Sequence, residues 1–76
     1  MQPHDRASTL NPDQYVDTET LAGLLSLSAI YLRQLRVKGG GPRFSKLGDK
    51  AVRYRVADAL AWASSKTATS TSELAA

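Results

Sequence analysis

Apolar residues in the first half of the chain recur at helical spacing and predict two short helices. Asp17 is a suitable N-cap for the first, because its carboxylate can accept hydrogen bonds from the free N–H groups of a first turn. The apolar face of this helix consists of Leu21, Ala22, Leu24 and Leu25. After a short interruption, Ser28 can cap a second helix over residues 29–37, which the glycines at 39–41 and Pro42 are expected to end.

A β-hairpin is predicted after the second helix. Residues 43–47 and 51–55 have β-like alternation, and Gly48 between them favours a tight turn because glycine accepts a positive φ. One face of the second strand carries Val52 and Tyr54, and the other face carries Arg53 and Arg55.

A last helix is predicted over residues 56–65. Its inner side consists of Val56, Ala59, Leu60 and Ala63. We expect Trp62, which flanks that side, and Tyr54 to be core aromatics. The order helix, three-residue turn, helix, hairpin, helix predicts a mainly α fold with a small β-hairpin: a winged helix-turn-helix of three helices plus a two-stranded wing.

The chain of 76 residues has room for one small domain. Residues 1–14 are polar and lack periodicity, so we expect a flexible N-terminal arm. Residues 66–76 include a low-complexity run of threonine and serine and are expected to form a flexible C-terminal tail. The winged helix-turn-helix domain itself is then predicted to span residues 15–65.

Positive charge is concentrated in the middle of the chain. Eight basic residues and one acidic residue, Asp49, lie between residues 29 and 56, which gives this segment a charge of +7. Since the net charge of the whole chain is +3, the remaining residues together carry −4. A basic centre with acidic flanks is typical of a nucleic-acid site, although a solvated basic face that binds nothing is the alternative.

The second predicted helix has a polar outer face. Leu32 and Leu35 define the inner side, so Arg33 and Gln34 point outward, where arginine matches guanine and glutamine matches adenine. Ile30 could meet a thymine methyl group or pack under the wing. The candidate DNA-binding residues of this recognition helix are Ser28, Ile30, Tyr31, Arg33, Gln34, Arg36, Val37 and Lys38.

Within this set the expected roles differ. Val37 is a second candidate for a thymine methyl group, and Tyr31 sits at the side, where its hydroxyl could reach a phosphate. Arg36 lies nearer the core and is assigned either to a phosphate or to an internal ion pair.

The hairpin is the second predicted contact with DNA, since a basic two-stranded ribbon suits phosphates beside a groove or the minor groove itself. Its candidates are Arg43, Lys46, Lys50, Arg53 and Arg55.

Several other classes of protein are disfavoured. The chain has no cysteine and a single histidine, so we expect no disulfide and no metal. No set of residues suits catalysis, so an enzyme is the weakest interpretation, and we expect no cofactor and no small-molecule ligand. No apolar run is long enough for a membrane span or a signal peptide. We therefore expect a cytoplasmic protein of bacterial or phage origin.

Residues 15–65 carry a series of short motifs in a characteristic order. The motifs are Tyr15-Val16-Asp17-Thr18, Leu24-Leu25-Ser26-Leu27-Ser28, Tyr31-Leu32-Arg33-Gln34-Leu35-Arg36, Gly41-Pro42-Arg43-Phe44, Lys46-Leu47-Gly48, Val52-Arg53-Tyr54-Arg55, and Asp58 with Trp62. In this order the stretch resembles the excisionase and AlpA-type proteins of phages and integrative elements, which share a MerR-like winged helix.

The resemblance implies DNA binding without catalysis. An excisionase, or recombination directionality factor, binds and bends attachment-site DNA so that an integrase excises the element. The alternative is an AlpA-type regulator of integrase or mobile-element genes, and a third, from another class, is a protein-interaction adaptor. The expected partners are double-stranded DNA, an integrase, and further copies of the chain bound head to tail on DNA.

Overall fold

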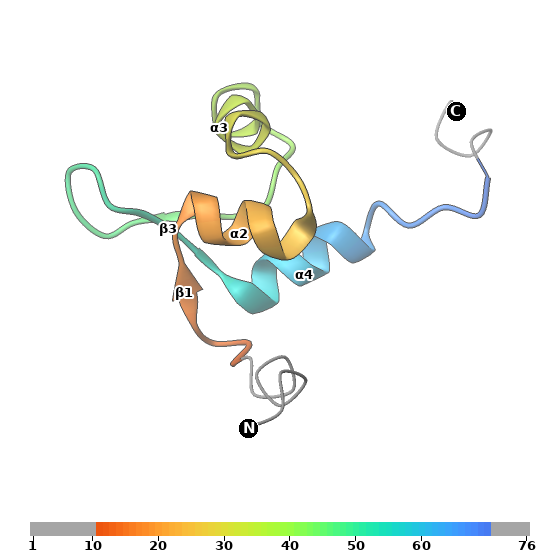
Figure 1. The fold of residues 1–76 in the computed structure, drawn as a ribbon, viewed down its shortest axis with the longest axis horizontal. Helices are drawn as coiled ribbons and strands as arrows, with labels where there is room; N and C mark the ends of the chain where they lie inside the picture. Colours follow the sequence, from red (N-terminus) through yellow and green to blue (C-terminus); the bar gives the residue numbers. More distant parts are fainter. Residues whose placement is uncertain (1–10, 71–76) are drawn as a thin grey trace.

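A computed structural model of the chain describes residues 11–70 (Figure 1). Its elements are, in order, β1 (Tyr15–Val16), α2 (Thr18–Leu25), α3 (Ala29–Lys38), β2 (Ser45–Lys46), β3 (Val52–Arg55) and α4 (Val56–Ser64). Residues 1–10 and 71–76, which make up most of the two expected arms, lie outside the described residues. None of the described helices is long and apolar enough to cross a membrane.

The helix boundaries follow from local chemistry. The Asp17 carboxylate accepts a hydrogen bond from the Thr20 amide at 2.8 Å, and the Ser28 hydroxyl accepts one from the Tyr31 amide at 3.0 Å. These contacts confirm both predicted N-caps. Helix α2 ends at Leu25, and its C-cap residue Ser26 has a left-handed φ of 57°. Helix α3 ends at Lys38, and its C-cap residue Gly39 has a φ of 91°. The glycine at that second end has no Cβ to strain, as the sequence predicted.

The sheet has three antiparallel strands, with β3 in the middle. Strand β2 pairs with β3 and forms the predicted hairpin, with Ser45 opposite Arg53. The expected two-stranded ribbon needs correction, because β1 adds a third strand on the other edge of β3, with Val16 opposite Tyr54. A two-residue strand is too short to show alternation, so its pairing with a distant segment has no local sequence signal.

The segment just before β1 is bonded to the start of α4. The Val56 amide donates to the Gln14 carbonyl at 2.9 Å, and the Ala57 amide donates to the Pro12 carbonyl at 2.8 Å. These carbonyls satisfy two of the free N–H groups of a helix whose N-cap residue, Arg55, makes no side-chain capping bond. The packed part of the chain therefore starts upstream of Tyr15, within the region expected to be an arm.

The core lies where α2, α3 and α4 meet β3. Its buried apolar residues are Val16, Leu21, Ala22, Leu32, Tyr54, Val56 and Ala59. Leu24 and Leu60, which were expected on inner faces, are instead exposed, and Leu35 is only partly buried. In a domain this small, the few short helices and strands bury only a narrow strip along each helix, so apolar residues at its edges stay exposed. Gly41 lies against this core, because a Cβ there would be 2.7 Å from the Leu35 Cβ.

Candidate nucleic-acid interface

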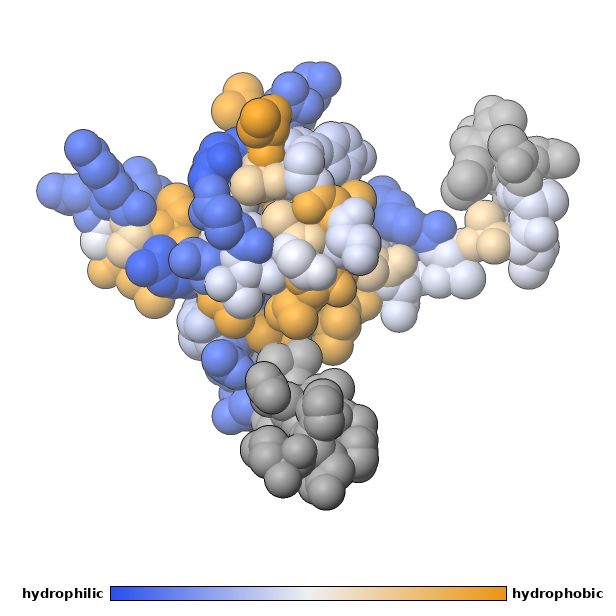
Figure 2. Space-filling model, viewed as in Figure 1, coloured by the Kyte–Doolittle hydropathy of each residue, from blue (hydrophilic) through white to orange (hydrophobic). Residues whose placement is uncertain are grey.

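Helix α3 presents one face to the core and the opposite face to solvent. Leu32 is fully buried, whereas Ile30 is 66% exposed and Val37 is 88% exposed. Arg33 and Gln34 lie between these two apolar side chains along the helix, and both are exposed. In Figure 2, the outer surface of α3 at the top of the molecule carries both hydrophilic and apolar side chains. The predicted outward face is therefore present, and Ile30 belongs to it rather than packing under the hairpin.

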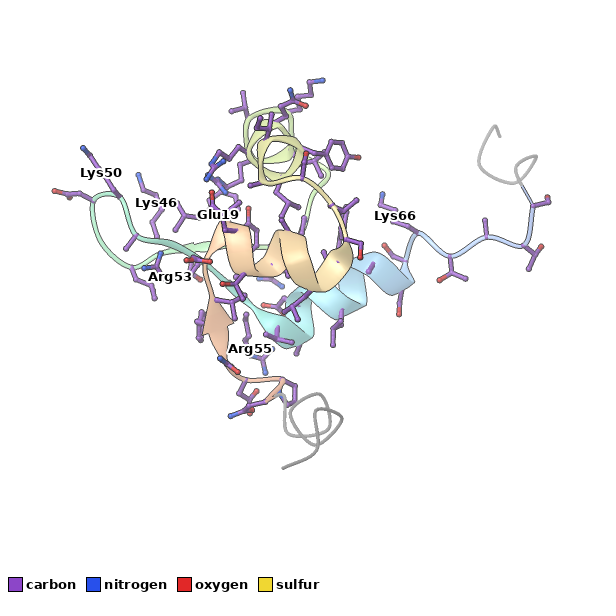
Figure 3. The ribbon with its side chains drawn as sticks, in the orientation of Figure 1. Glu19, Lys46, Lys50, Arg53, Arg55 and Lys66 are labelled. Atoms are coloured by element: carbon purple, nitrogen blue, oxygen red, sulfur yellow. The ribbon has the colours of Figure 1, made fainter. Side chains whose placement is uncertain are left out.

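The hairpin formed by β2, the loop at residues 47–51 and β3, here called the wing, projects from the body (Figure 1). The Leu47 amide donates to the Ala51 carbonyl at 2.8 Å, which closes the loop. Lys46 and Lys50 are exposed, and Figure 3 shows both reaching outward from the wing. Figure 2 shows hydrophilic side chains at the end of the same projection and apolar ones beside them. The wing is therefore a projecting hairpin beside α3 that carries two exposed lysines.

A cleft of about 260 Å³ lies where α2, α3 and the wing approach one another. Its lining residues are Asp17, Thr18, Glu19, Arg33, Arg36, Lys50, Val52 and Arg53. Four of these groups are cationic and two are carboxylates. The Arg33 Nη2 atom donates to the Glu19 Oε2 atom at 2.5 Å, so one cation of α3 is already paired across the cleft. We refer to this space as the cleft below.

Arg36 is partly buried and makes its contacts within the protein. Its Nη1 atom donates to the Thr18 hydroxyl at 3.0 Å and to the Tyr54 hydroxyl at 2.7 Å. Its guanidinium carbon lies 5.8 Å from the centre of the Phe44 ring and 5.9 Å from that of Tyr54. The sequence left a phosphate contact and an internal ion pair open. The structure shows an internal role, but with hydroxyl groups and aromatic rings as partners rather than a carboxylate.

Arg55 lies apart from the other wing cations. It sits at the end of β3 that joins α4, where its guanidinium pairs with Asp13 at 2.5 Å and with Asp58 at 3.4 Å. Chiefly through the hydrogen bond to Asp13, these carboxylates raise the pKa of Arg55 above its usual value. Figure 3 shows Arg55 well away from Lys46 and Lys50. The expected grouping of Arg55 with the wing cations is therefore not observed, because this end of the strand lies beside Asp13 and Asp58.

The remaining candidates occupy separate positions. Arg53 lines the cleft, and its Nη1 atom donates to the Val52 carbonyl at 2.8 Å. Arg43 lines a second hollow of about 350 Å³ behind the C-terminal end of α3, together with Phe44. Lys38 is exposed in the last turn of α3, and Tyr31 is half-exposed on its side. Ser28 uses its hydroxyl as the N-cap of α3.

No model of a known protein family matches this sequence, and no curated protein is significantly similar to it. The interpretation of the site therefore depends on its own geometry and on the residues named above.

Two features of the structure were not predicted from the sequence. The first is Glu19, which has no local signal because its partner Arg33 comes from the next helix. The second is the position of Trp62, which was expected in the core but is only partly buried. Its Nε1 atom donates to the Gly40 carbonyl at 2.7 Å, and the Lys66 ammonium lies 5.9 Å from the ring centre. Trp62 therefore attaches α4 to the loop that follows α3.

Proposed function

We propose that this protein binds double-stranded DNA in a sequence-specific manner, without catalysis, as a winged helix-turn-helix protein. In this proposal α2 and α3 are the helix-turn-helix pair, and α3 is the recognition helix that enters the major groove. The wing contacts the neighbouring phosphates or the minor groove. An α-helix fits the major groove of B-DNA, where each base pair presents a distinct set of donors and acceptors.

The observation that carries the proposal is that a residue of the exposed face of α3 and an exposed cation of the wing border one cleft. Arg33 of α3 and Lys50 of the wing both line it. A helix that carries base-reading side chains beside a cationic ribbon allows base contacts and phosphate contacts at the same time. Ile30 and Val37, both solvent-exposed, are suited to thymine methyl groups.

The biological role that we propose is that of an excisionase. Support comes from the resemblance of residues 15–65 to excisionase and AlpA-type proteins and from the small size of the domain. A single module of this kind covers about 600–1,000 Å² of DNA contact, which suits an architectural factor that works in several copies beside an integrase. An AlpA-type transcriptional regulator would use the same surface.

The experiment that tests DNA binding is selection from a pool of random duplexes with the purified full chain. We expect a short enriched motif of about one helical turn or less. The enriched duplex, placed at different positions in a longer fragment, then reports bending through its gel mobility. Mobility that depends on the position of the motif supports the excisionase role, whereas a straight complex favours the regulator. A pool that shows no enrichment over successive rounds contradicts sequence-specific binding.

A further inference from the structure

The Glu19–Arg33 pair lies at the surface that we propose for DNA. The side chains are 46% exposed for Arg33 and 67% exposed for Glu19. Ion pairs this open to water contribute little to folding stability. The ion pair with Glu19 is therefore expected to affect mainly the binding of ligands by Arg33, rather than the stability of the fold.

The carboxylate of Glu19 affects random and specific DNA differently. A phosphate that approaches Arg33 in the cleft also approaches this carboxylate, and like charges repel. Guanine presents two neutral acceptors, O6 and N7, to an arginine in the major groove. Arginine has five N–H donors, and Glu19 is bonded through Nη2 alone, so Arg33 keeps donors for a guanine edge while it stays bonded to Glu19.

The other charged groups of the cleft do not replace Glu19 in this contact. The Asp17 carboxylate accepts the Thr20 amide as the cap of α2. Arg53 donates to a backbone carbonyl, and Arg36 donates to two hydroxyls. Among the residues that line the cleft, Glu19 is thus the acid bonded to a cation of α3.

We propose that Glu19 is a specificity-determining residue, which weakens binding to random DNA and orients the Arg33 guanidinium toward a guanine edge. This inference rests on the proposed function above. Glu19 itself contacts no base in this scheme, so it acts as a positioning residue through Arg33.

The test compares two duplexes of equal length and composition. One is the duplex that wild-type protein enriches from a random pool, and the other is its scrambled counterpart. Glu19→Gln removes the charge with little change of shape. Asp49→Asn is the matched control, because it removes one negative charge from the exposed wing loop, outside the cleft. Thermal melting of each variant accompanies the binding measurements.

We expect Glu19→Gln to bind the scrambled duplex roughly three- to tenfold more tightly and the enriched duplex no more tightly than wild type, so discrimination falls by at least that factor. Asp49→Asn is expected to change the affinity for both duplexes by the same factor. In an Arg33→Ala background, Glu19→Gln is expected to leave discrimination unchanged, because the residue it positions is absent.

Two results would overturn the inference while leaving the proposed function intact. The first is an equal gain on both duplexes for Glu19→Gln, as for Asp49→Asn, since this is a simple charge effect. The second is a loss of discrimination by Glu19→Gln that persists without Arg33. If wild-type protein enriches no duplex at all, the proposed function fails and this inference fails with it.

Discussion

Three arginines of this protein differ in the groups to which their guanidinium is hydrogen-bonded. Arg36 is bonded to two hydroxyls, Arg55 is bonded to two carboxylates, and Arg33 is bonded to one exposed carboxylate. Thr18 and Tyr54, the partners of Arg36, are buried, whereas Glu19 is open to water. Arg36, with its buried partners, serves the fold, whereas Arg33 keeps guanidinium donors open to a ligand while it is bonded to Glu19.

Arg36→Ala is expected to destabilise the fold without changing how the protein responds to salt on DNA. The substitution leaves two buried hydroxyls without their donor, at about 1–3 kcal/mol in the free energy of unfolding. Urea unfolding measures this loss, and Arg43→Ala, at an exposed position, is the control. Below the melting temperature, the salt dependence of DNA binding is expected to match that of wild type. A slope reduced by about one unit would show that Arg36 contacts a phosphate after all.

Arg33→Ala and Gln34→Ala are expected to weaken binding to the enriched duplex by about 1–3 kcal/mol each, with a smaller loss on scrambled DNA. Both side chains lie on the exposed face of α3, and neither is part of the core. Fluorescence anisotropy with labelled duplexes measures both affinities. Wild-type affinity in both variants would remove α3 from the proposed interface.

At the scale of the elements, short segments are stabilised by their ends. Helix α2 has eight residues and depends on Asp17 at its start, whereas α4 receives backbone carbonyls from residues 12 and 14 instead of a side-chain cap. Short helices are marginal on their own, so each terminal hydrogen bond matters for the element as a whole. The tip of the wing is closed by backbone hydrogen bonds, including the one from the Leu47 amide to the Ala51 carbonyl, so its exposed side chains are best tested through binding.

Stability is expected to fall in acid partly through the cap of α2. Hydrogen bonds from Thr20 lower the pKa of Asp17 below the usual value of an aspartate, so the folded state favours the carboxylate. The resulting stabilisation is complete above the unfolded pKa and is lost as the pH falls through the lower folded pKa. Asp17→Asn keeps a capping oxygen but does not titrate. We expect its melting temperature to fall less than that of wild type between pH 6 and about pH 2. Parallel curves for the two proteins would contradict this expectation.

Lys50→Ala and Arg55→Ala are expected to have opposite phenotypes. Lys50 is exposed on the wing, so its loss is expected to weaken binding to all duplexes equally and to reduce the salt slope by about one unit. Arg55 pairs with two carboxylates, Asp13 and Asp58, and its side chain is 37% exposed, so its loss is expected to lower the melting temperature slightly and to leave the salt slope unchanged. Salt titrations of both variants, alongside thermal melts, distinguish the two roles. If Arg55→Ala lowers the slope as well, Arg55 contacts DNA from the base of the wing.

At the scale of the whole molecule, local chemistry was predictable and long-range pairing was not. The caps at Asp17 and Ser28 and the outward face of α3 follow from residues within one or two helical turns. Strand β1 depends on a partner about forty positions away, and the Trp62–Gly40 bond joins the last helix to a loop. The exposed side chains of α3 were expected, but the partner of Arg33 was not. Spacing along one helix identifies a face but not the neighbouring helix that covers it.

One domain of this size offers a short recognition helix and a small wing, so its footprint is expected to be about one turn of DNA or less. Excision complexes need a longer and often bent stretch, and bending 20–30 base pairs costs about 1–6 kcal/mol. We therefore expect a free protein that is largely monomeric and that loads cooperatively, head to tail, on repeated sites. Head-to-tail contacts do not close on themselves, so an array can follow the DNA.

Sedimentation of the free protein and gel shifts on fragments with one, two or three tandem copies of the enriched motif test this expectation. The second and third copies are expected to bind more tightly than the first, because each gains a protein neighbour. The matched control is a fragment in which half a helical turn of spacer separates the copies, which places neighbours on opposite faces of the duplex and is expected to abolish the gain. A stable two-fold dimer that binds one palindrome in a single step would contradict head-to-tail loading, because such a dimer uses up its contact surface in a closed pair.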